Sequence, residues 1–188
     1  MPTMAGTIGA LAAITGLSGT LVWLYNRLVR LRNLARSSWS DIDVLLKKRH
    51  DLVGNLVEIV KGYAGYEKAT LLGVTEARAR AMRAEGPGER GKEEAALGEK
   101  LPSLFAVAEA YPGLKASESF LELQKQLAEI ENGIEYARRY YNAVVRDYNT
   151  ATETFPSNLV APRFGFGRAE FFQLESPGER ERTDVRIS

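Results

Sequence analysis

The chain of 188 residues contains no cysteine and only one histidine, His50. The lack of cysteine excludes disulfides and thiolate metal sites. A single histidine also removes the usual basis for a histidine metal centre or a Ser-His-Asp triad. A carboxylate site stays open, but no pattern indicates one. We therefore expect no catalytic residues, no metal and no cofactor, and a protein that is not an enzyme.

Acidic residues are missing from the first forty positions, where the only charged side chains are four arginines. The net charge of the whole chain is +1, and from Asp41 onward 21 basic residues stand against 24 acidic ones, a net charge of −3. A mildly acidic body argues against nucleic-acid binding, which needs a basic surface. We expect no nucleic-acid partner.

Residues 4–25, MAGTIGALAAITGLSGTLVWLY, carry no charge. As a helix rising ~1.5 Å per residue they span roughly 33 Å, enough for a hydrocarbon layer of ~30 Å. Trp23 and Tyr25 stand at the end, where amphipathic rings favour the membrane interface. We interpret residues 1–26 as a single-pass transmembrane anchor. The alternatives are a buried core helix and a cleaved signal peptide, which normally has a positive charge before its apolar stretch.

The four arginines follow the anchor and point around the helix, because successive residues are rotated by ~100°. They are candidate contacts for anionic lipid head groups: Arg27, Arg30, Arg32 and Arg36. The positive-inside tendency places the N-terminus outside the cell membrane and the bulk of the chain in the cytoplasm.

After the anchor, apolar residues recur in steps of three and four, which predicts long helices with a buried stripe, as in a coiled-coil seam. One series runs from Trp39 to Tyr63 and the other from Phe120 to Tyr148. Turn signals at 62–65, 85–91 and 111–113 predict helices near 27–62, 66–84, 92–110 and 119–152, with a mobile linker at 88–94. The predicted fold is all-α: the transmembrane helix, then an antiparallel up-and-down four-helix bundle over residues 27–154, with two long and two shorter helices.

The pair Tyr-Asn occurs at 141–142 and again at 148–149, within the second apolar stripe. If the two long helices are antiparallel with residue 62 level with residue 119, Glu131 faces Arg49 and Arg138 faces Asp43. Tyr141 then lies beside Trp39, and Tyr148 lies near Asn33 and Leu34. We predict polar residues that fix the helix register: Asp43, Arg49, Glu131, Arg138, Tyr141 and Tyr148. The alternative is that this stripe faces a groove open to a partner.

Residues 155–188 form a tail that begins with many phenylalanines. Pro156, Pro162, Gly165 and Gly167 prevent one long helix. We expect the tail to dock on the first and last long helices as irregular chain and short turns, with shallow insertion into the membrane as the rival. The alternating ERER at 179–182 predicts a disordered C-terminus.

Several blocks, in order, resemble the LemA family. They are the run from YNRLVRLRNLARSSW to GYAGYEKATL, then YPGLKASESF, ARRYYNAVVRDYNT and FPSNLVAPRFGF. The resemblance covers roughly residues 20–175 and implies a single-pass bacterial or archaeal membrane protein with a four-helix, up-and-down bundle. It carries no catalytic residues over to this chain. One departure is Gly54, where the family usually has proline.

These observations favour a non-enzymatic, membrane-anchored helical scaffold or adaptor that presents a protein-interaction surface in the cytoplasm, with envelope maintenance as a candidate process. The alternative is a membrane-shaping or lipid-organising protein that acts through the arginines and the Phe-rich tail. The expected partners are membrane lipid and a protein of unknown identity, and a homo-oligomer is a further candidate.

Overall fold

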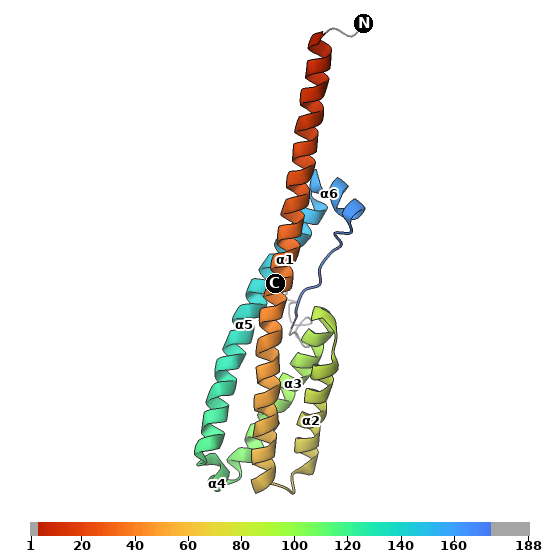
Figure 1. Cartoon of the computed structure of the whole chain (residues 1–188). Coiled ribbons are helices and arrows are strands. Elements are labelled where there is room, and N and C mark those ends of the chain that lie inside the picture. The colour runs from red at the N-terminus through yellow and green to blue at the C-terminus, as the bar shows by residue number, and fades with distance from the viewer. Residues whose placement is uncertain (1–3, 174–188) are drawn as a thin grey trace, which may run out of the picture. The chain divides into compact units, whose positions relative to one another are not determined.

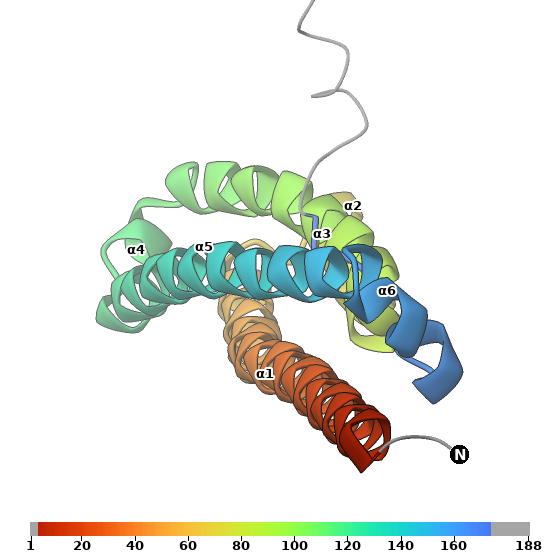
Figure 2. The same cartoon turned by 90° about the horizontal axis from the view of Figure 1, so that it is seen from above.

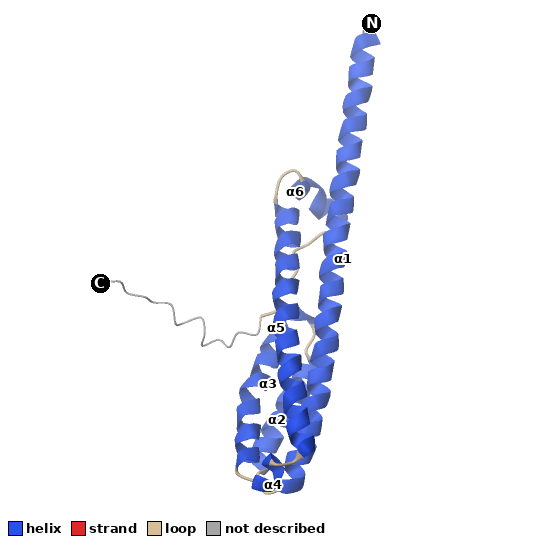
Figure 3. Cartoon of the chain, turned by 90° about the vertical axis from the view of Figure 1, so that its left-hand side faces the viewer, coloured by secondary structure: helices blue, strands red, loops and turns tan. Residues whose placement is uncertain are grey.

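The computed structural model describes residues 4–173, which form helices and loops without any strand (Figure 3). The helices in chain order are α1 (Met4–Tyr63), α2 (Lys68–Arg83), α3 (Gly86–Glu109), α4 (Pro112–Lys115), α5 (Glu118–Glu153), α6 (Ser157–Val160) and the 3-10 helix η1 (Ala161–Phe164). The all-α prediction is therefore confirmed for this part of the chain. The ERER segment and the disorder predicted for it lie outside the described residues.

Helix α1 continues without a break from the uncharged stretch into the charged part of the chain. Within residues 4–173 it is the one helix long and apolar enough to cross a membrane, and only 6% of its apolar window is buried. Four of its large apolar side chains are 61–67% exposed: Ile8, Leu11, Ile14 and Leu17. A helix that leaves its apolar side chains uncovered all round is typical of a membrane span and not of a core helix.

The chain divides into two compact units. The first contains α1 as far as Ser38 together with residues 143–169, and the second contains residues 39–142 together with the tail from Glu170. Both α1 and α5 contribute residues to each unit. The predicted domain boundaries at residues 26 and 154 remain a prediction.

The second unit is organised around one apolar core between α1, α2, α3 and α5 (Figure 1). Steps of three and four residues bring the buried positions to one side of each helix, as the sequence indicated. Figure 2 shows α4 in the connection between α3 and α5, and its Leu114 is fully buried in the core. The central core residues are Val53, Leu56, Val60, Val74, Ala77, Leu97, Leu104, Phe120 and Leu127.

Helix α3 begins at Gly86, so the mobile linker predicted over residues 88–94 is wrong. Pro87 lies in the first turn, where a missing backbone N–H costs nothing. Arg90 donates hydrogen bonds to the carbonyl of Ala84 and forms an ion pair with Asp43. The segment that reads as a flexible loop is therefore the anchored start of a helix.

Gly91 in α3 lies directly against the backbone of the tail. A Cβ atom added there would be 2.2 Å from the carbonyl oxygen of Gln173, which is closer than any real contact allows. The tail main chain therefore packs on α3 at a position where only glycine fits.

In the first unit, residues 161–166 fold back on α1. Phe166 and Ala161 join a core with Leu28, Tyr148 and Ala151. Figures 1 and 3 show α6 beside α1, and η1 is followed by Gly165, which has a left-handed φ of 69°. The sharp reversal after Phe164 therefore depends on glycine.

The close approach at Gly91 predicts opposite effects for two helix glycines. Gly73→Ala adds a Cβ with nothing within 4 Å, so we expect it to stabilise the fold by up to about 1 kcal/mol through helix propensity. Gly91→Ala forces the tail away from α3, and we expect a loss of about 1–3 kcal/mol. Urea unfolding of the full chain in detergent, followed by circular dichroism, measures both. Equal stabilisation by the two changes would contradict the packing of the tail on α3.

Candidate functional site

A cluster of charged side chains lies in the middle of the second unit. Arg49 and His50 come from α1, Glu94 from α3 and Glu131 from α5. Arg49 is 4% exposed and Glu94 is completely buried. Burial of this kind is rare for charged residues unless they are paired.

Glu94 is the centre of the cluster, because each of its carboxylate oxygens has its own partner. The Nη1 atom of Arg49 lies 2.7 Å from Oε2, and the Nε2 atom of His50 lies 2.6 Å from Oε1. Since a carboxylate accepts, His50 Nε2 must carry the hydrogen of that bond. The Nε atom of Arg49 also forms an ion pair of 2.7 Å with Oε1 of Glu131.

The cluster connects four helices. Besides α1, α3 and α5, helix α2 takes part through Arg78, whose Nε donates a 2.6 Å hydrogen bond to the backbone carbonyl of His50. Removing charges from water costs several kcal/mol per ion, and only well-formed partners offset that cost. Helices that slip out of register would leave Glu94 or Arg49 unpaired. That the cluster fixes the alignment of the helices remains a prediction.

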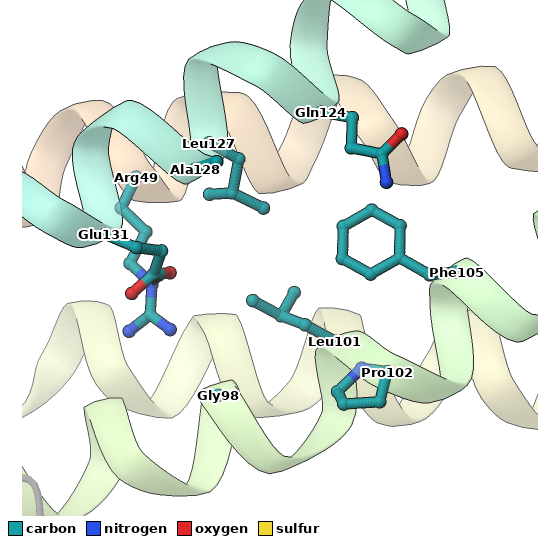
Figure 4. Close-up of a pocket in the computed structure, with 9 residues that line it drawn as sticks. All are labelled: Arg49, Gly98, Leu101, Pro102, Phe105, Gln124, Leu127, Ala128 and Glu131. Atoms are coloured by element: carbon teal, nitrogen blue, oxygen red, sulfur yellow. Dashed lines mark ion pairs between the residues drawn. The ribbon is translucent and has the colours of Figure 1, made fainter.

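An open groove begins at the Arg49–Glu131 pair and runs between α3 and α5 (Figure 4). Its volume is about 360 Å³, and its walls are mainly apolar, with Leu101 and Phe105 from α3 and Leu127 from α5. In Figure 4 the ion pair closes one end, while Gln124 and Phe105 lie at the other. The arrangement suits apolar side chains better than a reacting substrate.

The Tyr-Asn repeat holds the tail. In the second unit, the side chain of Asn142 accepts a hydrogen bond from the backbone N–H of Phe172 and donates one to its carbonyl, at 3.0 and 2.9 Å. In the first unit, Asn149 does the same with Ala169, at 2.8 and 3.0 Å. The hydroxyl of Tyr141 donates to the carbonyl of Glu170 at 2.9 Å. We call these contacts the asparagine clamps.

The spacing of the clamps follows from chain geometry. Asn142 and Asn149 are seven residues apart in α5, and seven helical residues span about 10.5 Å. Ala169 and Phe172 are three residues apart in a segment without turn or bend, and three extended residues span about 10 Å. Seven helical residues and three extended residues are therefore of similar length.

Burial changes the acidity of both tyrosines. Loss of water contact, and secondarily the negative charge of Glu170, raises the pKa of Tyr141 from 10.0 to about 12. Burial likewise raises the pKa of Tyr148, although the nearby Arg32 and Arg36 act in the opposite direction. The hydroxyl of Tyr141 therefore keeps the proton that it donates to the carbonyl of Glu170 well above neutral pH.

Several of the predicted register residues have the neighbours that the antiparallel alignment implied. Glu131 pairs with Arg49, and the ring of Tyr141 lies 5.4 Å from that of Trp39. Tyr148 is buried in the core of the first unit with Leu28, and its predicted position near Asn33 and Leu34 remains a prediction. Whether these residues set the register remains a prediction.

The predicted pair between Asp43 and Arg138 is wrong. Asp43 forms its ion pair with Arg90 of α3, and no ion pair joins it to Arg138 within residues 4–173. The reason is that α3 starts earlier than expected and brings Arg90 to the side of α1 on which Asp43 lies.

The four arginines after the anchor differ in their surroundings. The guanidinium of Arg32 lies 4.6 Å from the ring centre of Phe166, so it interacts within the protein. Arg27 lies 5.7 Å from the ring centre of Trp23 and is exposed, as are Arg30 and Arg36. Head-group contacts by these residues remain a prediction.

Glu94 was not predicted as a site residue, and Asn142 and Asn149 were noted only as members of the Tyr-Asn repeat. Glu94 was assigned to a linker, although it precedes Leu97, Leu101, Leu104 and Ala108 in steps of three and four, which place it on the buried face of α3. No group of three or more histidine, aspartate or glutamate side chains that could hold a metal ion occurs within residues 4–173.

Comparison with known proteins identifies related sequences. The family model described as LemA family matches residues 38–188. Magnetosome protein MamQ 2 of Paramagnetospirillum magneticum is 28% identical over 205 aligned positions, which cover 93% of this chain and 75% of the relative. Magnetosome protein MamQ of Magnetospirillum gryphiswaldense is 25% identical, with 85% and 68% covered, and Protein LemA of Metamycoplasma hominis is 28% identical, with 87% and 74% covered. The matched region includes the charge cluster and both clamps.

Glu94→Ala tests the charge cluster, because it leaves Arg49 and His50 buried without their shared acceptor. We expect a loss of about 3–5 kcal/mol in the free energy of unfolding. The neighbouring Glu93 forms its ion pair with the half-exposed Arg80, so Glu93→Ala is the control and should cost less than about 1 kcal/mol. Denaturant unfolding of both variants measures the difference. Similar losses of stability would show that the buried Glu94 contributes no more to the free energy of unfolding than a surface ion pair does.

The raised pKa of Tyr141 predicts a loss of stability in strong alkali. Because the pKa is higher in the folded state, the contribution of this tyrosine is fully present below about pH 10 and is lost as the pH rises through about 12. Ultraviolet titration of phenolate should show a component near pH 12 that Tyr141→Phe removes. Tyr66 is 96% exposed, and Tyr66→Phe should leave that component in place. A titration curve unaltered near pH 12 by Tyr141→Phe would contradict the burial of this hydroxyl.

Proposed function

Because the chain belongs to the LemA family, we propose that it is a membrane-anchored, non-enzymatic scaffold whose second unit presents a binding surface for another protein. The apolar start of α1 supports the anchor. The buried charged residues support a structural role, since Glu94 is completely buried and its two carboxylate oxygens contact Arg49 and His50. The observation that supports the binding surface most directly is the open apolar groove between α3 and α5.

The chemistry of the groove suggests its occupant. Its apolar walls suit leucine-sized side chains, and a helix offers such side chains in a row at positions three and four apart. The side chain of Glu131, which is 39% exposed, lines the closed end of the groove, where a basic group of a partner can reach it. We infer that the partner segment is an apolar helix face followed by a lysine or arginine.

The proposed arrangement in the cell follows from the charge distribution. The arginines after the span favour a cytoplasmic body, in which two long and two shorter helices form an antiparallel up-and-down bundle. The scaffold then acts by holding its partner at the membrane surface, because the anchor confines the groove to that surface. A role in envelope maintenance is compatible with such a protein.

Filling the groove should abolish partner binding without unfolding the protein. Ala128 lies exposed in the groove wall on α5, so Ala128→Trp occupies the space that a partner needs. We expect a photo-crosslinking amino acid at Gln124 in the full chain, in native membranes, to give a discrete adduct that Ala128→Trp removes. The adduct peptide should carry the apolar helix face and a basic residue.

The matched control is Ala106→Trp, which adds the same side chain at an exposed position of α3 outside the groove. It should leave the adduct unchanged. An adduct that survives Ala128→Trp, or the absence of any adduct at Gln124, would refute the proposed binding surface.

A further inference from the structure

The turn formed by α6 and η1 contacts the last residues of the apolar span. The ring of Tyr25 lies 5.0 Å from that of Phe164 and 5.6 Å from that of Phe166. Leu24, one residue earlier, is only 3% exposed. All these residues belong to the first unit.

The depth of this turn follows from the length of the span. About twenty helical residues cross a hydrocarbon layer of ~30 Å, and the uncharged stretch ends at Tyr25. A segment packed on Tyr25 therefore lies at the boundary between hydrocarbon and head groups, whichever way the chain is oriented.

The turn has both buried and exposed apolar side chains. Val160, Ala161 and Phe166 are buried. Three large apolar side chains in and just before the turn are largely exposed: Phe155 is 79% exposed, Leu159 61% and Phe164 57%. Exposed apolar groups of this size, gathered in one short segment, indicate a contact with lipid or protein.

Positive charge adjoins the turn. A groove of about 400 Å³ lies between α1 and the end of α5; Arg27 and Arg30 line one side of it and Asp147 of α5 lines the other. The two arginines outnumber this single carboxylate. Thr150 and Thr154 contribute hydroxyls, and Thr154 directly precedes the exposed Phe155. Arginine is well suited to bind a phosphate group, so an apolar surface and a phosphate-binding groove meet at the depth of the lipid head groups.

We propose that the α6–η1 turn is a second membrane contact of the protein. Phe155, Leu159 and Phe164 insert into the interfacial layer of the bilayer, and Arg27 and Arg30 bind the phosphodiester of a glycerophospholipid in the adjoining groove. The end of α5 is thereby fixed at the membrane surface, independently of any partner in the groove of the second unit. This inference rests on the membrane span of α1.

The lack of cysteine in the chain makes the insertion directly measurable. Single cysteines at Phe155, Leu159 and Phe164 carry a nitroxide label in the full chain, reconstituted in vesicles of phosphatidylethanolamine and phosphatidylglycerol. We expect the three labels to collide with oxygen more than with a water-soluble nickel chelate. Ile14→Cys, within the span, should report the hydrocarbon, and Tyr66→Cys, 96% exposed in the second unit, should report water.

The controls separate the inference from the anchor on which it rests. If the Ile14 label is in lipid but the three turn labels behave like the Tyr66 label, the turn does not touch the membrane. If the turn labels are shielded from both reagents and show spin–spin broadening, a second copy of the chain covers them, and the lipid contact is refuted. An Ile14 label in water would refute both the span and the inference.

The phosphate site has its own test. Full chain released from nanodiscs into a mass spectrometer should retain phospholipid, and the double variant Arg27→Gln, Arg30→Gln should retain roughly tenfold less. Arg139→Gln, which removes an exposed arginine of the second unit, should have no effect. Parallel nanodiscs of phosphatidylglycerol and phosphatidylethanolamine show which head group is preferred, and unchanged retention by the double variant in both would refute the site.

Discussion

The carboxylate of Glu94 is the group on which the second unit depends. It is fully buried and accepts from Arg49 through one oxygen and from His50 through the other. Apolar stripes tolerate small shifts along a helix because leucine packs against many neighbours, whereas a buried ion pair has one good geometry. The stripes therefore bring the helices together, and we expect the charges to favour one alignment.

Much of the architecture could be predicted from the sequence. The helices from Trp39 to Tyr63 and from Phe120 to Tyr148 have apolar residues in regular steps, and burial follows these steps. The start of α3 could not be predicted, because Gly86, Pro87, Gly88 and Gly91 read as a loop. Two of these glycines have structural reasons that the sequence pattern does not show. Gly86 adopts a left-handed φ of 72°, and Gly91 leaves room for the main chain of the tail.

The contacts between the two long helices could be predicted in part, whereas the contacts made by α3 could not. The antiparallel alignment of the two long helices predicts that Glu131 lies beside Arg49, because both residues belong to long, regular helices. The partner of Asp43 and the role of Glu94 depend on α3, whose position the pattern did not give. The clamp asparagines were visible as a repeat, but their ligand is the main chain of the tail, which has no sequence signature.

The asparagine clamps form hydrogen bonds with peptide groups of the tail and not with its side chains. Each amide binds the N–H and the carbonyl of a single residue, which every amino acid except proline offers alike. Substitutions in the tail therefore leave the asparagine clamps intact, provided that proline is avoided at Ala169 and Phe172, that the side chain at Ala169 still packs on the core of the first unit, and that the bulk of Phe172 is kept. Relatives of this protein can thus share one tail path while their tail sequences diverge.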